Sequence, residues 1–589
     1  MCGIAGLMTL DGTPADPTIL GALAASLAHR GPDGGGWHVA GDVGMVHSRL
    51  AIIDLETGDQ PLHGDGDLAL VANAEIYNHV ELRDFLSGVT FATGSDCETP
   101  LPLYRRHDLN YADHLRGMYA IALHDPVRRR LVLSRDPFGI KPLYYAETAQ
   151  GLAFASEPRA LIAAGLVVAA EHPGARDEVL QLQFSTGRET PLAGVLRVLP
   201  GETLVVEGGR IVGRRRLAAL PKGSPEEMEE GLALERLDAA LEDSVRLHQR
   251  ADVPYGMFLS GGIDSSALLA MMARVNETPV RAFTVGFPGS AATDERDHAR
   301  CLAKLTGAEH VEVAFTEADF WGLLPRLAAV MDDPAADYAV LPTYKLAECA
   351  AGEGLKVVLS GEGGDELFAG YGRYRSVLRP FWLGGRVMRP RGIFDGLGVL
   401  KQEPEGWRDG IAAAEIHARD GARSKLQVAQ ATDCADWLPN DLLAKLDRCL
   451  MHHGVEGRTP FLDREVACAV FRLPDSLKLR KGLGKWILRR WLAQHLPESK
   501  PFSRKRGFTV PVGEWISREG ARLGPLVAAQ EGVAALCDKG AVTALFAGAA
   551  RKRKGQAAWT LLFYALWHRA HILGLPPQGG IFETLSVKG

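Results

Sequence analysis

The sequence lacks the features of a secreted, membrane-spanning or metal-thiolate protein. Only eight of its 589 residues are cysteine, and no two have the C-x-x-C spacing that holds zinc or carries out redox chemistry. No apolar run reaches the ~18 residues of a membrane span, and the first thirty residues have no charged segment followed by an apolar one. We therefore expect reduced thiols and a cytoplasmic location.

Positive charge is scarce for a nucleic-acid-binding protein. The formal net charge is −6, and the basic runs, such as Arg214–Arg216, are short. The sequence therefore indicates no surface that binds the phosphates of a nucleic acid. With 46% hydrophobic and 23% charged residues, the composition is that of a globular protein. We expect small-molecule substrates, with neither nucleic acid nor membrane as a partner. The oligomeric state stays open, with a homodimer as one option.

The first 205 residues have a β-rich pattern. Short runs such as Leu68–Ala72 end at turn-like sequences, here Asn73-Ala74-Glu75. Helical periodicity is found at Pro17–His29 and His79–Leu86. These segments predict sheets covered by helices.

The pattern changes after a polar segment that begins near Gly208. A helix is expected at Glu226–Gln249, and the short apolar strands Tyr255–Leu259, Arg281–Phe287 and Lys356–Leu359 then alternate with helices. Such alternation is typical of a doubly wound parallel sheet. Because 589 residues exceed one core, we expect two domains, at residues 2–205 and 225–575.

Cys2 is the most unusual cysteine. If Met1 is removed, Cys2 becomes the N-terminal residue and carries a thiol and an α-amine in one amino acid. A thiol has a pKa of about 8.5 and an α-amine one of about 7.7–8.0, so the amine is a general base of nearly matched proton affinity. Cys2 is therefore a candidate nucleophile that needs no histidine.

Several short motifs follow Cys2 in a fixed order. They are M-C-G-I-A-G at 1–6, H-R-G-P-D at 29–33, H-S-R-L-A-I-I-D at 47–54, N-A-E-I-Y-N at 73–78, G-S-D-C-E at 94–98 and R-D-P-F-G-I-K-P-L-Y-Y at 135–145. Together they resemble the class II, or N-terminal nucleophile (Ntn), glutamine amidotransferases. The resemblance implies a four-layer αββα Ntn-hydrolase sandwich and glutamine hydrolysis at Cys2.

The resemblance also implies a glutamine pocket. Glutamine is a zwitterion, whose carboxylate suits a guanidinium and whose ammonium suits carboxylates. Arg49 takes the first role, Asp96 and the Glu75 region the second, and Leu50, Ile52 and Ile53 form the wall. The oxyanion donors are the Asn73 side-chain amide and the Ala74 backbone N–H.

Ala74 departs from the family, which has glycine at this position. Ala keeps the backbone N–H, so the oxyanion hole is intact if the local φ is negative. A positive φ would cost on the order of 1 kcal/mol and tilt the donor. The sequence leaves both alternatives open.

A serine- and glycine-rich loop, F-L-S-G-G-I-D-S-S at 258–266, connects an expected strand to a helix. Backbone N–H groups at such a turn bind phosphate, but no Gly-Lys-Ser/Thr closes it, so it is not a Walker A loop. It resembles the pyrophosphate loop of ATP pyrophosphatases. The resemblance implies ATP binding by Leu259, Ser260, Gly261, Gly262, Asp264, Ser265, Ser266 and Val285.

A second loop, L-S-G-E-G-G-D-E-L-F at 359–368, lacks the third glycine of a dinucleotide fingerprint. It is similar to the S-G-E-G-x-D-E loop of asparagine synthetases. By that likeness Ser360 and Gly361 contact ATP and Glu362 supports formation of an acyl-adenylate. Asp365 and Asp264 are then the carboxylates for Mg²⁺, which takes one or two such ligands plus phosphate oxygens.

Two later motifs resemble the same family. They are G-R-T-P-F-L-D at 457–463 and G-K-W-I-L-R at 484–489. A lysine at this place in the family stabilises the charge that shifts onto pyrophosphate, and here it is Lys485. The last seventy residues carry no readable motif.

The resemblance implies an α/β enzyme of the glutamine-hydrolysing asparagine synthetase kind. Its N-terminal Ntn-hydrolase sandwich is followed by a doubly wound parallel α/β ATP-pyrophosphatase domain with a helical C-terminal part. L-Aspartate, L-glutamine and ATP would give L-asparagine, glutamate, AMP and pyrophosphate, with ammonia passed between the sites. The main alternative keeps this mechanism but amidates another carboxylate, in a peptide, a cell-wall precursor or a secondary metabolite. A β-lactam synthetase shares the layout, but Cys2 speaks against it.

Overall fold

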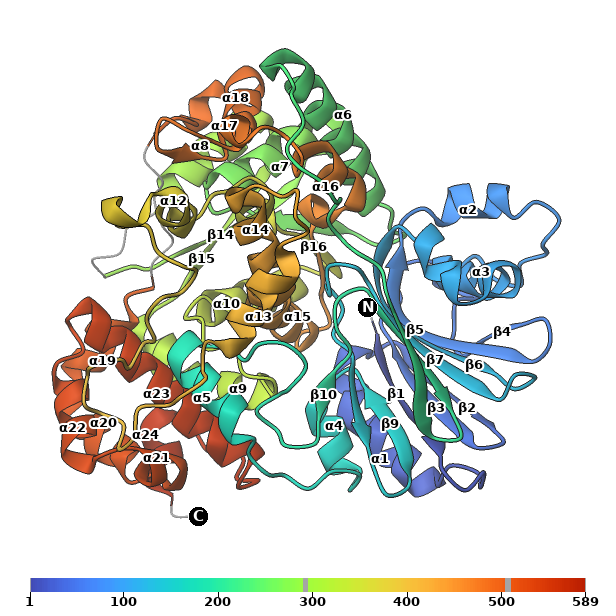
Figure 1. The fold of residues 1–589 in the computed structure, drawn as a ribbon, viewed down its shortest axis with the longest axis horizontal. Coiled ribbons are helices and arrows are strands. Elements are labelled where there is room, and N and C mark those ends of the chain that lie inside the picture. Colours follow the sequence, from blue (N-terminus) through green and yellow to red (C-terminus); the bar gives the residue numbers. More distant parts are fainter. Residues whose placement is uncertain (1, 290–294, 504–509, 588–589) are drawn as a thin grey trace.

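Two antiparallel sheets of six strands form the N-terminal part of the molecule, drawn in blue and cyan in Figure 1. The computed structural model describes residues 2–289, 295–503 and 510–587. The first sheet has the order β10-β8-β9-β1-β3-β2 and the second β12-β11-β7-β6-β5-β4. The strands of the first sheet are β1 (Gly3–Thr9), β2 (Gly34–Ala40), β3 (Val43–Arg49), β8 (Tyr144–Glu147), β9 (Gly151–Ala155) and β10 (Leu196–Arg197); those of the second are β4 (Leu62–Gly64), β5 (Leu68–Ile76), β6 (Gly117–Asp125), β7 (Arg130–Arg135), β11 (Glu202–Glu207) and β12 (Arg210–Arg216).

The two sheets stack face to face because their strands bury side chains on both sides. In β1, Ile4 and Met8 point into the core between the sheets, while Ala5 and Leu7 pack under helices. The sequences of such strands are therefore apolar along nearly their whole length, without alternation of polar and apolar residues. Helices cover the outer faces: α1 (Pro17–Leu27) and α4 (Pro158–Ala163) lie on the first sheet, and α2 (His79–Phe85) and α3 (Pro100–His107) lie on the side of the second. The expected αββα sandwich is confirmed.

One local prediction, that of a turn at residues 73–75, differs from the structure. The sequence Asn73-Ala74-Glu75 was expected to form a turn, but it lies inside β5, with Asn73 opposite Ala120 and Ala74 opposite Tyr119 of β6. The turn interpretation is wrong because tertiary pairing with β6 overrides the weak strand propensity of Asn and Glu. The polar residues are therefore held on a rigid strand.

The second part of the chain contains a five-stranded parallel sheet of order β15-β14-β13-β16-β17. The order of the strands along the chain reverses between β13 and β16, which makes this place the topological switch point. Ligands of open α/β sheets bind at the carboxyl ends of the strands there. The strands are β13 (Tyr255–Phe258), β14 (Arg281–Gly286), β15 (Glu309–Ala314), β16 (Val357–Leu359) and β17 (Glu456–Arg458).

Helices cover both faces of this sheet, as expected for a doubly wound fold. The predicted helix at Glu226–Gln249 begins later, at Glu230, as α6. One apolar core lies under α6 (Glu230–His248), α7 (Ile263–Val275), α8 (Arg296–Thr306), α16 (Arg464–Val470) and α18 (Trp486–His495); the other lies under α9 (Glu317–Val330), α10 (Val340–Gly352) and α15 (Ala444–Met451).

Short helices connect β16 to β17 and α16 to α18. The segment before α15 is a π-helix, η5 (Asp433–Leu443), which continues directly into α15. The remaining elements are α5 (Pro173–Leu182), α11 (Gly364–Leu367), α12 (Gly372–Leu378), η4 (Phe381–Leu383), α13 (Asp409–Ala418), α14 (Lys425–Thr432), α17 (Asp475–Lys478), β18 (Leu479–Arg480) and β19 (Leu483–Gly484).

The C-terminal helices, red in Figure 1, belong to the same core as α9 and α10. Indole N–H groups of α23 donate to the loop before α10: Trp559 to the carbonyl of Ala336 (2.6 Å) and Trp567 to that of Asp332 (3.1 Å). This motif-free region therefore positions a loop of the synthetase half. The helices are α19 (Val512–Arg518), α20 (Gly520–Ala528), α21 (Glu531–Leu536), α22 (Lys539–Ala547), α23 (Lys552–His571) and α24 (Ile581–Ser586).

Within the described ranges, no helix combines the length and apolar character needed to cross a bilayer. All eight cysteines are free thiols.

Candidate functional site

Cys2 is held at both ends of its backbone just before β1. Its N–H donates to Asn73 Oδ1 (3.1 Å), and its carbonyl accepts from Nε of Arg30 (3.2 Å). Burial raises the pKa of the Cys2 thiol, so a base is needed to form the thiolate. Met1, whose removal would free that base, lies outside the described residues.

Asn73 and Ala74 lie next to Cys2 on β5. The Nδ2 of Asn73 is buried and has no hydrogen-bond partner among the described residues, so this donor is available for an oxyanion. Ala74 is not among the residues with positive φ, because it has strand geometry. Of the two alternatives for this position, the unstrained one therefore holds.

Arg49 stands at the end of β3 with its guanidinium already engaged. It pairs with Asp59 Oδ1 (2.9 Å) and donates to the carbonyl of Asp54. The Asp59 side chain is 73% exposed, so an entering carboxylate can displace it from the Arg49 fork.

The two acids expected to face the ammonium of glutamine differ in their contacts. Asp96 Oδ2 accepts the N–H of Ile76 (2.6 Å). Glu75 instead pairs across to Arg458 (2.8 Å), on a strand of the parallel sheet. Burial raises the pKa of both carboxyls above their usual values, and a bound ammonium would lower them again.

Leu50 and Ile52 are buried among side chains from both halves of the molecule, including Ile140 and Leu237, with Ile53 half-buried beside them. The expected pocket wall is therefore also part of the contact between the two halves.

The pyrophosphate loop leaves β13 at the switch point. Gly262 caps α7, and the Oγ atoms of Ser260 and Ser265 are 3.1 Å apart. Gly261 has φ +68°, which favours glycine. Ser266 is buried and its hydroxyl has no partner among the described residues. Leu259 and Val285, at the ends of β13 and β14, are buried beneath the loop.

The loop after β16 lies against the first one. Ser360 N–H donates to the carbonyl of Arg458 (2.8 Å). A Cβ at Gly364 would stand 2.5 Å from Asp264 Oδ1, so only glycine permits this approach. Gly361 is similarly close, with its Cβ position 3.0 Å from Cβ of Asp264. The two loops together form one site.

Lys485 joins three motifs in this site. Its Nζ bridges Asp264 of the first loop and Asp365 of the second, with 2.7 Å to Asp365 Oδ1. Burial opposes the charge, but the two carboxylates raise the pKa of Lys485. Because both acids converge on one cationic atom, their geometry suits a divalent ion that also binds phosphate oxygens.

Glu362 is half-buried at the same loop. Burial raises the pKa of its carboxyl, and the nearby Lys445 acts in the opposite direction. Sequence reasoning assigned no role in the reaction to Lys445 or to its partner Asp337 (2.8 Å).

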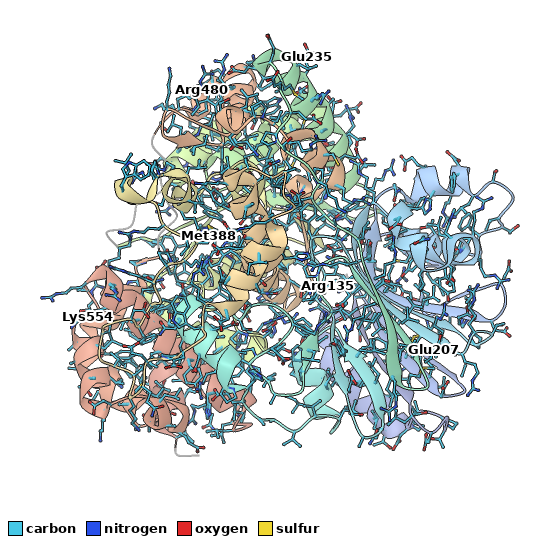
Figure 2. All side chains as sticks on the ribbon, in the orientation of Figure 1. Arg135, Glu207, Glu235, Met388, Arg480 and Lys554 are labelled. Carbon is cyan, nitrogen blue, oxygen red and sulfur yellow. The ribbon has the colours of Figure 1, made fainter. Side chains whose placement is uncertain are left out.

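Sequence reasoning also missed the contacts that join the two halves. The fully buried Arg30 binds Asp447 through two hydrogen bonds, of 2.8 and 2.9 Å. A second arginine that sequence reasoning missed, Arg135 (labelled in Figure 2), makes its contacts within the N-terminal half, where it donates to three carbonyls, among them Gly139 (2.9 Å) and Val198 (2.7 Å). The signal for both is an arginine inside a motif with no assigned chemistry.

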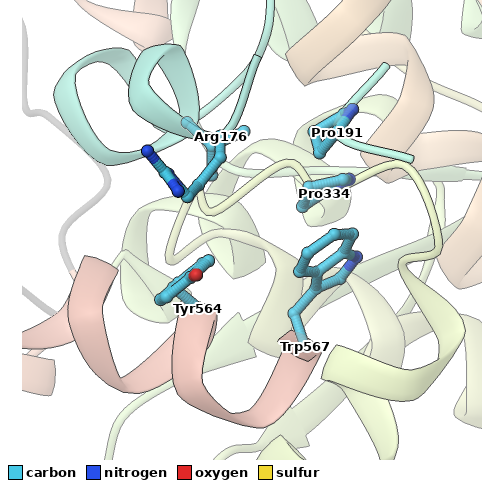
Figure 3. Close-up of a pocket in the computed structure, with 6 residues that line it drawn as sticks. Arg176, Pro191, Pro334, Tyr564 and Trp567 are labelled. Atoms are coloured by element: carbon cyan, nitrogen blue, oxygen red, sulfur yellow. The ribbon is translucent and has the colours of Figure 1, made fainter. Parts of the chain in front are cut away.

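A shallow depression between α5 and α23 is not a ligand site. Figure 3 shows Arg176, Pro191, Pro334, Tyr564 and Trp567 around it. These side chains leave no space for a water molecule. The place is a packed seam that supports the loop before α10.

Comparison with known proteins agrees with this geometry. The chain matches the family model "Asparagine synthase" over residues 236–569 and "Glutamine amidotransferase domain" over residues 1–216. It is 32% identical to the glutamine-hydrolyzing asparagine synthetase 1 of Bacillus subtilis, over 97% of each chain. It is 34% identical to a putative glutamine-hydrolyzing asparagine synthetase of Mycobacterium tuberculosis, over 96% of this chain and 97% of that one.

A third relative has a different name. Amidase chyE of Penicillium rubens is 34% identical over 60% of this chain and 55% of its own. The first two matches extend over nearly the whole chain, and both sites described above fall inside the matched ranges. The chain therefore belongs to the asparagine synthase family, with a glutamine amidotransferase domain preceding the synthase region.

Proposed function

We propose that this protein makes L-asparagine from L-aspartate, with glutamine as the nitrogen donor and ATP as the energy source. Residues 2–205 form the glutaminase domain and residues 225–575 the synthetase domain, and the reaction takes place in the cytoplasm. The observation that carries the proposal is the convergence of Lys485, Asp264 and Asp365, from three separate motifs, at the switch point of a parallel sheet.

In the glutaminase domain, the Cys2 thiol attacks the side-chain amide of glutamine after its own α-amine takes the thiol proton, and that proton leaves with the ammonia as the C–N bond breaks. Water then hydrolyses the Cys2 thioester to release glutamate. The Asn73 amide and the Ala74 N–H stabilise the oxyanion. Arg49 binds the substrate carboxylate in place of Asp59, and Asp96 binds the ammonium. Ammonia crosses inside the molecule, because in water it would be protonated and lose its nucleophilicity.

In the synthetase domain, the loops after β13 and β16 hold the phosphates of ATP, and Glu362 lies where the acceptor carboxylate is adenylated. Lys485 stabilises the negative charge that builds on the pyrophosphate. Mg²⁺, held by Asp264 and Asp365, would supply further neutralisation of phosphate oxygens. The β-aspartyl-AMP formed there is then attacked by ammonia, which releases AMP.

The test is mass spectrometry of the products formed from glutamine, ATP with Mg²⁺ and a panel of carboxylates. We expect asparagine, glutamate, AMP and pyrophosphate in equal amounts with L-aspartate. Amidation of another carboxylate, with none of aspartate, would overturn the acceptor assignment and keep the mechanism. Glutamate release without AMP under all conditions would overturn the synthetase assignment.

A further inference from the structure

A second group of charged side chains adjoins Glu362. It comes from four separate segments: Asp337 from the loop before α10, Arg389 from the loop after η4, Asp441 from η5 and Lys445 from α15. The charges of this group act on one another and on Glu362. Among the hydrogen bonds of the described residues, one ion pair links two members of the group, Lys445 and Asp337.

Asp441 is the least satisfied carboxyl of the group. Its side chain is 0% exposed, and neither of its oxygens has a hydrogen-bond partner among the described residues. An unsatisfied buried charged group costs more than the ~1–3 kcal/mol of a neutral one, so such groups are uncommon in native proteins. Burial raises the pKa of Asp441 well above its usual value. Within the described part of the chain, no cationic side chain donates a hydrogen bond to Asp441.

Arg389 has the complementary deficiency. Its guanidinium lies over the ring of Trp437 (4.0 Å) with Phe184 nearby (5.2 Å). Its Nε and Nη2 are buried and unpartnered within the described part of the chain. These two donors form one edge of the guanidinium fork, the edge that binds a carboxylate through two parallel hydrogen bonds. The aromatic rings orient the fork, and the edge stays open.

The helix places these groups in a row. Trp437, Asp441 and Lys445 follow at intervals of four residues, about one turn, along η5 and α15, so they share a face. Arg389 lies at the Trp437 end of the row, and the charge of Lys445 reaches Glu362 at the other. The unpartnered edge of Arg389 therefore lies at one end of this row, the unpartnered carboxyl of Asp441 in the middle, and the proposed adenylation site at Glu362 near the other end.

We propose that Asp441 and Arg389 bind the α-ammonium and the α-carboxylate of an acceptor amino acid, whose side-chain carboxylate is thereby presented beside Glu362. This inference rests on the proposed function and names the side chains that would select a free α-amino acid over a carboxylate within a peptide chain. A carboxylate within a peptide chain has neutral amides in place of both head-group charges, so it offers no counter-charge to either Asp441 or Arg389.

A purely structural role explains the contacts less well. Lys445 donates a 2.8 Å hydrogen bond to Asp337 and none to Asp441, although the charge of Asp441 also acts on Lys445. Neighbouring acids of η5 are satisfied: Asp436 Oδ1 accepts the N–H of Gly187 (2.8 Å), and Asp433 pairs with Arg373 (2.8 Å). Asp433 and Asp436 of this helix therefore have hydrogen-bond partners, whereas Asp441 has none among the described residues.

The experiment compares three small molecules that differ only in the head group. L-Aspartate carries both α-groups, succinate lacks the ammonium and β-alanine lacks the carboxylate. With saturating ATP and Mg²⁺, pyrophosphate release gives kcat/KM for L-aspartate, and competition gives Ki for the other two. The full-length variants are Asp441→Asn and Arg389→Gln, and Asp436→Asn serves as a control for a buried acid on the same helix.

We expect Asp441→Asn to lower kcat/KM for L-aspartate by about tenfold to a hundredfold, the usual effect of losing one charge-assisted hydrogen bond. Ki for succinate should change less than about twofold, because succinate has no ammonium that could bind Asp441. Arg389→Gln should weaken L-aspartate and succinate alike and leave β-alanine unaffected. Asp436→Asn should alter none of these ratios.

The outcomes separate the two hypotheses. If L-aspartate is a substrate and each variant weakens all three molecules equally, the head-group proposal is wrong and the proposed function stands. If another free amino acid with a side-chain carboxylate is the substrate and loses affinity in the variants, the head-group proposal stands and the assignment of L-aspartate as the acceptor is wrong. Turnover only of acceptors with blocked α-groups would overturn both.

Discussion

The guanidinium of Arg458 lies 2.8 Å from the carboxylate of Glu75, and this ion pair joins the strand of the oxyanion donors to the parallel sheet. Arg458 Nε also donates to Glu456 (2.5 Å). Although burial opposes it, the charge of Arg458 lowers the pKa of Glu456 to about 2. One arginine thus neutralises a carboxylate from each half of the molecule.

Removal of Arg458 should therefore destabilise the whole chain. Arg458→Met removes the guanidinium that two buried acids share, and breaking a buried pair in this way costs about 3–5 kcal/mol. Arg472→Met is the matched control, since its pair with Glu226 is half-exposed and an exposed pair contributes at most about 1 kcal/mol. Denaturant unfolding measures both, and equal losses would contradict this account.

Cys2→Ala should abolish glutamine-driven synthesis and leave ammonia-driven synthesis largely intact, because the thiol serves only the first half-reaction. Cys301→Ala, at an exposed thiol, should change neither. Product assays with each nitrogen source make the comparison. Loss of both activities in Cys2→Ala, or an active preparation whose intact mass retains Met1, would refute the assignment.

Ala74→Gly tests the oxyanion donor. Since Ala74 already has strand geometry, glycine relieves no strain and should not raise glutaminase turnover. It should lower stability by roughly 0.5–1 kcal/mol through backbone entropy. A clear gain in turnover would indicate that the wild-type strand is strained at Ala74. A tenfold fall, about 1.4 kcal/mol, would mean that the donor has been misplaced.

Lys485→Ala and Glu362→Gln should each reduce pyrophosphate release by a factor of about 10² to 10³, the usual cost of removing a preorganised charge. The defect should be the same with glutamine or ammonia, and glutamate formation from glutamine should persist. Lys539→Ala, on the exposed start of α22, is the control. Unchanged pyrophosphate release would remove both residues from the mechanism.

Asp441→Asn should raise the stability of the ligand-free protein at neutral pH. Burial raises the pKa of Asp441 above the 3.8 of a free side chain, while Asp337 and Glu362 reinforce the shift and Lys445 and Arg389 oppose it. The folded state then holds a proton that the unfolded state loses, so the contribution of Asp441 to wild-type stability falls as the pH rises above about 4.

Asparagine cannot ionise, so the two proteins should unfold alike below about pH 4 and diverge at higher pH. Thermal unfolding across a pH series, at fixed salt and without substrates, measures the difference. A variant less stable than wild type at pH 7 would indicate that Asp441 has a structural partner.

The amino-acid sequence by itself determined the family, the order of the two halves and the chemistry-bearing loops. Local signals suffice for these features: Cys2 follows Met1, glycines mark the turns after β13 and β16, and short apolar strands alternate with helices. Local reading misjudged Asn73-Ala74-Glu75, because pairing with β6 decides that segment and no nearby residue reports it.

Only the tertiary structure decided which charges meet. Glu75 and Arg458 are far apart in the chain, as are Arg30 and Asp447, and a motif does not show whether a buried arginine faces a carboxylate across the seam. Asp441 and Arg389 lie in no motif and look like surface charges in the sequence. They become informative only when burial removes water from them and no described residue forms a hydrogen bond in its place, because packing, and not sequence spacing, decides whether a charge is satisfied.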